Sequence, residues 1–311
     1  MRTISLMLHK TRKKKGGFFS YLATPFKEDG EVNYLILEKY TKEIVESGVD
    51  GVTCLASTCE GPYLSEEERL KVLETITKEV GGRCMLNVGI GAMSTRQALR
   101  NAKQAEDHGA TSLMLELQQY YPVTPEDAYK HFSTIAENVS TDIRLYNLPL
   151  PTKFDFSPQQ ISEFAEIKKI SSVKEASGDI NRIKIIRALC GNRYEIYCGF
   201  HYQALDGFRL GADGWEVMLH PYIAKPCVEL YRSLEINPWS AESELLFKKL
   251  ETLFIFFKTY GVPQSIKAIS NWTELKLGSP RAPFRSLNEK EANRLKEIVD
   301  KLFTKEDTQH E

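Results

Sequence analysis

The sequence predicts an α/β protein, a (β/α)8 TIM barrel with a C-terminal helical extension, from three observations. Eight short β-rich runs alternate with amphipathic stretches from residue 17 onward. Such alternation is typical of βαβ units around a parallel sheet, and eight strands close a barrel. The chain has 311 residues, whereas a bare barrel takes about 250. The strand pattern stops after residue 222, so we expect the surplus to be helical.

The predicted strands are short and rich in β-formers. They cover residues 18–23, 51–55, 85–88, 112–117, 143–147, 170–174, 195–198 and 214–218. A doubly wound open sheet is the rival fold, and it usually carries a GxGxxG turn after an early strand. Here Gly89-Ile90-Gly91 lacks the third glycine, which favours the barrel.

The helices are predicted from apolar periodicity and from the residues that begin or end them. Residues 32–47 place apolar side chains at close to helical spacing. Ser65 and Glu68 form a capping box, and Pro125 and Pro158 each stand at a predicted first helical position. Further helices are expected from Ser94 or Thr95 onward and over 180–189, 202–210, 242–258, 263–275 and 287–303.

Charge and cysteine content exclude several classes of partner and site. Lys and Arg number 41 and Asp and Glu number 42, so nothing favours binding to nucleic acid or to an anionic membrane. No apolar run approaches the roughly 20 residues of a membrane span. The six cysteines contain no CxxC pair, which is typical of reduced thiols in a cytosolic protein rather than of a zinc site. We therefore expect a cytoplasmic protein with neither nucleic-acid nor membrane partners.

The predicted organisation has three parts. Residues 1–16 form a basic leader in which the basic cluster follows a short apolar piece. That order is the reverse of a secretory signal, and we expect the leader to be disordered. Residues 17–225 form the barrel, and residues 226–311 form a C-terminal helical domain.

The search for chemistry concentrates on the carboxyl ends of the strands, where barrel enzymes place their active sites. Lys174 ends an apolar run, so its amine is expected to point into the barrel mouth, where desolvation lowers its pKa. A neutral amine can attack a ketone and form a Schiff base. The alternative is a lysine whose stem covers apolar surface while its charge stays in water.

Hydroxyl groups at two other strand ends could assist such an amine. Tyr146 ends the preceding strand, where its phenol could transfer protons or simply fill the barrel mouth. Ser57 and Thr58 offer two hydroxyls and two backbone N–H groups on a turn, which suits a substrate carboxylate. Ordinary turn chemistry also uses such residues.

Four further features have open interpretations. Cys59, beside the hydroxyl pair, could act as a nucleophile. His201 could contact the distal end of a substrate or donate a proton, or it could be a solvent-facing loop residue. Glu216 could face the barrel interior or pair with a basic residue of the helix layer. Gly211 and Gly214 could bind phosphate, but they fit a helix end and a strand start better.

Three motifs stand at strand ends in an order and at a spacing that suit a barrel. They are Ser57-Thr58-Cys59-Glu60 after the second strand, Tyr146-Asn147-Leu148-Pro149 at the fifth and Val173-Lys174-Glu175-Ala176-Ser177-Gly178-Asp179 at the sixth. Together they resemble the dihydrodipicolinate synthase / N-acetylneuraminate lyase family. The resemblance covers about residues 17–290.

The resemblance implies a class I lyase or aldolase that needs neither a metal nor an organic cofactor. Lys174 would form a Schiff base with pyruvate or another 2-oxo acid, and Tyr146 would shuttle protons. Ser57 and Thr58 would bind the substrate carboxylate, and Ser57 would also relay protons. The second partner would be an aldehyde or a sugar acid.

The resemblance also implies an assembly, a homotetramer built from dimers or a homodimer. A tyrosine after the fourth strand would reach into the neighbouring subunit's site. Tyr120 has the spacing of the synthases, and Tyr121 remains an alternative as a substrate-binding residue. Gly199 and His201, after the seventh strand, would lie near the substrate.

Two positions depart from the family patterns. Synthases that use aspartate semialdehyde usually carry an arginine two residues after the proline of the tyrosine motif, yet Pro149 is followed by Leu150 and Pro151. Sialic-acid lyases carry acidic residues after the seventh-strand glycine, yet Gly199 is followed by Phe200. These differences argue against the lysine-pathway reaction and against a sialic acid as substrate.

The leading hypothesis is therefore a Schiff-base-dependent lyase or aldolase of the dihydrodipicolinate synthase type. One alternative is a catalytically inactive or regulatory barrel that binds a 2-oxo acid or an amino acid. Another is a 2-keto-3-deoxy sugar acid aldolase or dehydratase of the same family.

Overall fold

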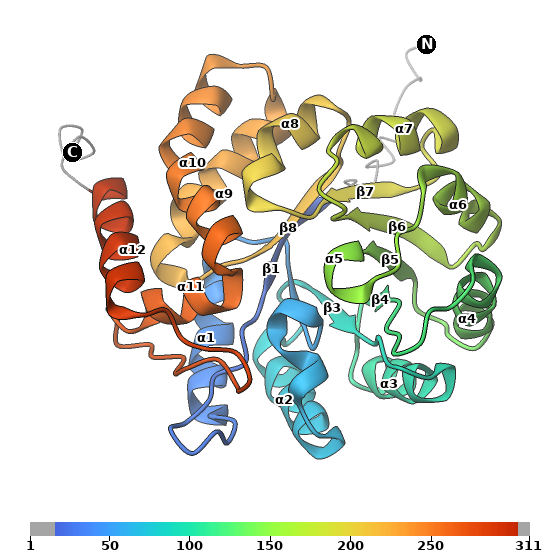
Figure 1. The fold of residues 1–311 in the computed structure, drawn as a ribbon, viewed down its shortest axis with the longest axis horizontal. Coiled ribbons are helices and arrows are strands. Elements are labelled where there is room, and N and C mark those ends of the chain that lie inside the picture. Colours follow the sequence, from blue (N-terminus) through green and yellow to red (C-terminus); the bar gives the residue numbers. More distant parts are fainter. Residues whose placement is uncertain (1–15, 304–311) are drawn as a thin grey trace, which may run out of the picture.

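Eight parallel strands form a closed barrel in the computed structural model, which describes residues 16–303 (Figure 1). The strands follow one another around the barrel in chain order, and the last pairs with the first. The predicted (β/α)8 fold is confirmed. The strands are β1 (Gly17–Tyr21), β2 (Gly51–Cys54), β3 (Met85–Gly89), β4 (Ser112–Glu116), β5 (Ile143–Asn147), β6 (Ile170–Glu175), β7 (Glu195–Cys198) and β8 (Gly214–Met218).

A layer of helices surrounds the barrel and buries the outward side of the strands (Figure 1). Successive residues of a strand point to opposite faces, so Val52, Leu145 and Val173 face the helices, and all three are fully buried. The helices of this layer are α1 (Tyr34–Glu46), α2 (Glu66–Val80), α3 (Thr95–Asp107), α4 (Pro125–Glu137), α6 (Pro158–Glu163), α7 (Asn181–Cys190), α8 (Ala204–Arg209) and α9 (Pro221–Ile236).

The predicted helix starts follow from side chains that satisfy free backbone N–H groups. Ser65 accepts a hydrogen bond from the backbone N–H of Glu68, and the Glu68 carboxylate accepts one from the backbone of Ser65. Ser94 caps α3, and Thr124 caps α4 ahead of Pro125. Such caps matter because the first turn of a helix lacks internal acceptors.

Helix α9 was missed because two of its residues are prolines. Pro221 occupies the first helical position, which needs no donor, and Pro226 lies inside the helix. Proline is otherwise a helix breaker, so these two residues argued against a helix over this segment. The helix also crosses the predicted boundary at residue 225. The predicted leader, residues 1–16, lies outside the described residues except for Gly16.

The C-terminal helical region is confirmed. It contains α10 (Ala241–Tyr260), α11 (Val262–Ser270) and α12 (Glu289–Leu302), which lie together on one side of the barrel (Figure 1). Helix α11 ends five residues before the predicted end at 275. It contacts β8 and the turn after β2, so the extension reaches the carboxyl ends of the strands.

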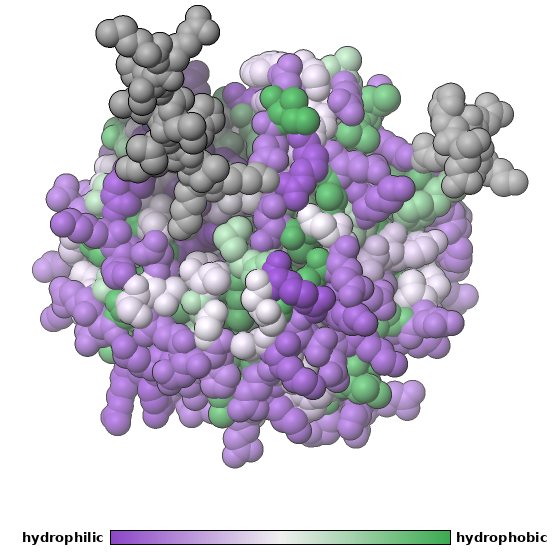
Figure 2. Space-filling model, turned by 180° about the vertical axis from the view of Figure 1, so that it is seen from behind, coloured by the Kyte–Doolittle hydropathy of each residue, from purple (hydrophilic) through white to green (hydrophobic). Residues whose placement is uncertain are grey.

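The surface seen from behind is mostly hydrophilic, with small separate apolar areas (Figure 2). Within residues 16–303, none of the helices combines the length and the apolar character needed to cross a membrane.

A buried ion pair occupies the barrel interior. Glu216 faces inward rather than toward the helices, and its Oε2 accepts a hydrogen bond from Arg144 Nη1 at 3.0 Å. Thr53 and Asn87 donate to Glu216 Oε1, and the Arg144 guanidinium lies 3.5 Å from the centre of the Tyr197 ring. Burial alone would raise the pKa of Glu216, but Arg144 and the other neighbours hold it below its usual value.

Arg144→Met should destabilise the protein by about 3–5 kcal/mol, because it leaves the Glu216 carboxylate buried without its cation. Urea unfolding followed by circular dichroism measures this loss. The matched control is Arg144→Met combined with Glu216→Leu, which removes both charges and should recover most of the stability. A single variant as stable as the wild type, or a double variant no better than the single, would contradict this role of the pair.

Candidate active site

Lys174 places an amine inside the closed barrel. It lies on β6, its side chain is 2% exposed, and its Nζ donates a hydrogen bond to Tyr21 Oη at 2.6 Å. The amine also lies 4.5 Å from the centre of the Tyr146 ring. Within residues 16–303 it forms no ion pair. Burial lowers its pKa to about 8, although Glu216 opposes the shift.

The parallel register explains why Lys174 and Tyr146 meet. Tyr146 on β5 pairs with Lys174 on β6 and with Glu116 on β4. Residues paired in register stand at the same level of a parallel sheet, and the alternation along β6 turns Ser172 and Lys174 to the same side. Ser172 accepts a hydrogen bond from Arg144 inside the barrel, so Lys174 faces inward as well.

The phenol of Tyr146 stays protonated at neutral pH. Burial raises its pKa well above the usual value, and the neighbouring side chains of Ser57 and Tyr21 only partly oppose this effect. The Ser57 hydroxyl lies beside the phenol without the geometry of a hydrogen bond. A phenol in this position can give a proton to a leaving group and take one back.

The turn after β2 presents two unpartnered hydroxyls. Ser57 and Thr58 begin the 3-10 turn η1 (Ser57–Cys59), and Thr24 supports the turn by donating to the carbonyl of Cys59 at 2.7 Å. The Oγ of Ser57 and the Oγ1 of Thr58 are buried and have no hydrogen-bond partner among the described residues. Buried hydroxyls without partners are costly, so this turn is suited to a ligand with acceptor oxygens.

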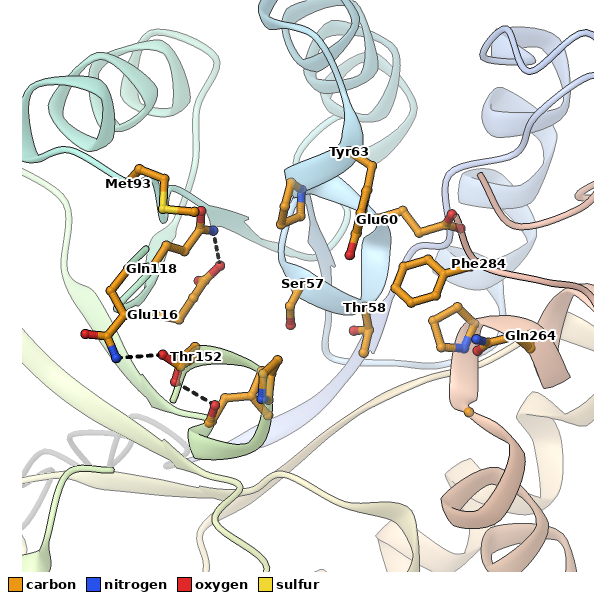
Figure 3. A pocket seen from close by; sticks show the side chains of 16 residues that line it. Ser57, Thr58, Glu60, Tyr63, Met93, Glu116, Gln118, Thr152, Gln264 and Phe284 are labelled. Carbon is orange, nitrogen blue, oxygen red and sulfur yellow. Dashed lines mark hydrogen bonds between the residues drawn. The ribbon is translucent and has the colours of Figure 1, made fainter. Parts of the chain in front are cut away.

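These hydroxyls line a cavity of about 510 Å³ at the carboxyl ends of the strands. Figure 3 shows Ser57 and Thr58 between Glu116 and Gln118 on one side and Gln264 and Phe284 on the other. The short helix α5 (Pro149–Thr152), which the sequence analysis did not predict, and the start of α11 complete the wall. Lys174 and Tyr146 do not line this cavity themselves, but Ser57 both lines it and adjoins Tyr146.

The two candidate tyrosines after β4 lie apart from this cavity. The side chains of Tyr120 and Tyr121 are 83% and 78% exposed, and their rings pack against each other with centres 5.1 Å apart. Neither lines the cavity of its own chain.

His201 is buried, so the solvent-facing alternative is wrong. It begins the 3-10 turn η4 (His201–Gln203) and its ring packs against Phe254 and Phe257 of α10. Burial lowers its pKa to about 4, and it does not line the cavity. Gly199 serves close packing, because a Cβ there would lie 2.6 Å from the carbonyl oxygen of Glu175.

Two other hypotheses lose support. Cys59 is fully buried, and burial raises the pKa of its thiol well above the usual value, which argues against a nucleophilic thiolate. Gly211 follows α8 and Gly214 begins β8, so they lie at the amino end of the strand, away from the cavity. Within the described residues, no group of three or more His, Cys, Asp or Glu side chains could hold a metal ion.

Sequence analysis missed two residues of the site. Tyr21, the partner of Lys174, looks like any other large residue of a buried strand, and nothing in the sequence distinguishes it. Glu116 did carry a signal, because it ends the apolar run of β4 as Lys174 ends that of β6. A charged residue at the end of an apolar strand points to the barrel mouth for an acid as it does for a lysine.

Comparison with known proteins connects this geometry with one family. The model of the dihydrodipicolinate synthetase family matches residues 14–302. A 4-hydroxy-tetrahydrodipicolinate synthase of Desulforamulus reducens is 30% identical over 292 residues, covering 92% of this chain and 97% of the relative. One from Desulforudis audaxviator is 29% identical over 290 residues, covering 91% and 96%.

Solved structures agree with this result. The dihydrodipicolinate synthase from Agrobacterium tumefaciens superposes with a TM-score of 0.87 at 28% identity, covering 93% of this chain and 98% of that one. The dihydrodipicolinate synthase from Aquifex aeolicus gives a TM-score of 0.87 at 27% identity, covering 92% and 97%.

Lys174 should titrate near pH 8 rather than near its ordinary pKa of 10.5, because burial disfavours the ammonium form. Its neutral fraction then rises as the pH increases through 8. NMR of protein labelled with 13C at the lysine Cε positions measures the midpoint, and the signal lost in Lys174→Met assigns the residue. A midpoint near 10.5 would contradict desolvation of the amine.

Proposed function

Because the chain belongs to the dihydrodipicolinate synthetase family, we propose that it is a Schiff-base-dependent lyase acting on pyruvate or a related 2-oxo acid. One observation carries the proposal. A buried lysine amine with a lowered pKa lies next to a protonated phenol at the carboxyl ends of the barrel strands. A desolvated amine beside a proton donor is the arrangement that imine formation requires.

The first step joins the amine to the 2-oxo acid. The neutral Nζ of Lys174 attacks the C2 carbonyl carbon, and the carbonyl oxygen takes up a proton to give a carbinolamine. The nitrogen lone pair then expels this hydroxyl as water, with a proton from Tyr146, which leaves a protonated imine and the Tyr146 phenolate. Ser57 and Thr58 have unpartnered hydroxyls that can donate hydrogen bonds to the carboxylate of the bound acid.

The second step makes or breaks a bond at C3. The Tyr146 phenolate takes a proton from C3 and converts the protonated imine to an enamine, whose C3 attacks the carbonyl carbon of an aldehyde. The aldehyde oxygen takes its proton from the Tyr146 phenol. Water then adds to the protonated imine and returns one proton to the phenolate, and the product leaves with the Lys174 amine restored. The reverse sequence cleaves the same bond. The cavity of about 510 Å³ lies beside Ser57 and offers room for the second reactant.

The burial of Lys174 and the loop after Pro149 also help to choose between a synthase, a regulatory barrel and a sugar-acid aldolase. A regulatory barrel would need a binding pocket but no desolvated amine, so the burial of Lys174 favours the enzyme. The names of the relatives favour the synthase reaction. The loop after Pro149 nevertheless has no arginine for a second carboxylate, and this leaves a sugar-acid aldolase as the second candidate.

We also propose a homodimer or homotetramer in which Tyr120 completes the neighbouring subunit's site. The exposed pair Tyr120 and Tyr121 forms an aromatic surface, and exposed aromatic side chains are typical of protein interfaces. The cytoplasm is the proposed location, since all six cysteines are free and reduced thiols persist there.

Borohydride reduction in the presence of pyruvate should attach one 1-carboxyethyl group to Lys174, because hydride adds to C2 of the imine and gives a secondary amine that water cannot cleave. Peptide mass spectrometry locates the adduct. Lys174→Ala is the control and should give none. A wild-type protein that forms no adduct, or an adduct on a different lysine, would overturn the proposed function.

Mixing two inactive variants should restore activity if Tyr120 acts across an interface. In a mixed dimer, the Lys174→Ala chain supplies Tyr120 to the site of the Tyr120→Phe chain, whose lysine is intact. About half of the dimers are mixed after random pairing, and one of the two sites in each is complete. The mixture should therefore show roughly a quarter of the wild-type activity. Steady-state turnover of the mixture after unfolding and refolding measures this. The matched mixture with Tyr121→Phe in place of Tyr120→Phe tests the other tyrosine. No gain over the separate Lys174→Ala and Tyr120→Phe variants would exclude the shared site.

A further inference from the structure

Glu116 is a buried acid with one unused oxygen. It ends β4, is 2% exposed and lines the cavity. Its Oε1 accepts a hydrogen bond from Gln118 Nε2 at 3.0 Å, whereas its Oε2 has no partner among the described residues (Figure 3). A buried polar atom without a partner destabilises the protein, so a ligand that donates a hydrogen bond there would remove this cost.

The backbone beside Glu116 makes room for the carboxyl group. A Cβ at Gly91 would lie 2.6 Å from Glu116 Cδ and 2.7 Å from Oε1. Any side chain at this position would displace the carboxyl group. The absence of a side chain at Gly91 thus permits the acid to lie where it does in the cavity.

No cation in the described part of the chain neutralises Glu116 by direct contact. Arg69 and Lys174 both lower its pKa, but burial is the stronger effect and raises it. The guanidinium of Arg69 donates instead to the carbonyls of Leu55, Gly61 and Gly89. The carboxyl group is therefore available to a ligand.

The rest of the cavity wall combines apolar side chains with a few hydrogen-bond acceptors and lacks a cation among the described residues. Within the described residues of one chain, no Lys, Arg or His lines it. Its other acid, Glu60, is paired with Lys267 at 2.5 Å. On the wall opposite Glu116, Gln264 Oε1 is also buried and unpartnered (Figure 3). A ligand that fits both walls offers hydrogen-bond donors, and a carboxylate placed beside Glu116, away from the Ser57 and Thr58 hydroxyls, would meet no cation.

We propose that Glu116 is a specificity-determining residue and accepts a hydrogen bond from a hydroxyl group of the second reactant, an uncharged hydroxylated aldehyde. The proposal rests on the proposed function, because this aldehyde is the partner of the 2-oxo acid bound to Lys174. It assigns the cavity wall formed by β4 to the aldehyde and leaves Ser57 and Thr58 to the carboxylate of the first reactant.

The test compares two aldehydes that differ in their hydroxyl groups. With pyruvate as the first reactant, kcat/KM is measured for D-glyceraldehyde and for propionaldehyde. The wild type should prefer glyceraldehyde, and Glu116→Leu should lower the ratio of the two values about 10- to 100-fold, as expected for a hydrogen bond to a carboxylate. Glu116→Gln, which keeps one acceptor oxygen, should lower the ratio less.

Gly91→Ala is a second, independent variant, because it shifts the carboxyl group of Glu116 without removing it. It should also lower the ratio of kcat/KM for glyceraldehyde to kcat/KM for propionaldehyde. A merely structural role of Glu116 would reduce both kcat/KM values equally and leave the ratio unchanged, which would overturn the proposal. A wild type that uses aspartate semialdehyde more efficiently than glyceraldehyde would overturn it as well. Failure of the wild type to trap pyruvate on Lys174 would instead overturn the proposed function itself.

Discussion

The site depends on one constraint, the burial of the Lys174 amine inside a closed barrel. Its hydrogen-bond partner is the hydroxyl of Tyr21, a neutral group, so the charged form of the amine is poorly solvated. Glu216, also in the barrel interior, favours the ammonium form, but it is paired with Arg144 at 3.0 Å, and Arg144 disfavours that form. The two charges oppose each other, so burial dominates and lowers the pKa of the amine to about 8.

Three parts of the barrel have different roles: the interior, the carboxyl end of the strands and the cavity beside that end. The Arg144–Glu216 pair fills the interior and supports the barrel electrostatically. The amine and the phenol stand in register on adjacent strands at the carboxyl end, and the cavity lies beside them. The C-terminal extension belongs to this arrangement, since Gln264 at the start of α11 forms part of the cavity wall. The helices beyond the barrel are thus part of the site rather than an independent addition.

Much of the fold could be predicted from the sequence because strands and helices leave local signals. Strand runs, caps and the lysine at the end of β6 all depend on neighbours in the chain. The rest depends on barrel closure. Tyr21 meets Lys174 across 153 positions of sequence, and His201 is buried by Phe254 and Phe257 of α10. Contacts of this kind leave no periodicity or motif.

Imine formation at Lys174 can be tested by a crystal structure of the protein soaked with pyruvate and then reduced. We expect continuous electron density from Lys174 Nζ to C2 of the former pyruvate, with its carboxylate within hydrogen-bond distance of the Ser57 and Thr58 hydroxyls. The Tyr146 phenol should lie beside the new C–N bond. Pyruvate bound elsewhere, with the Lys174 amine unmodified and still donating to Tyr21, would contradict it.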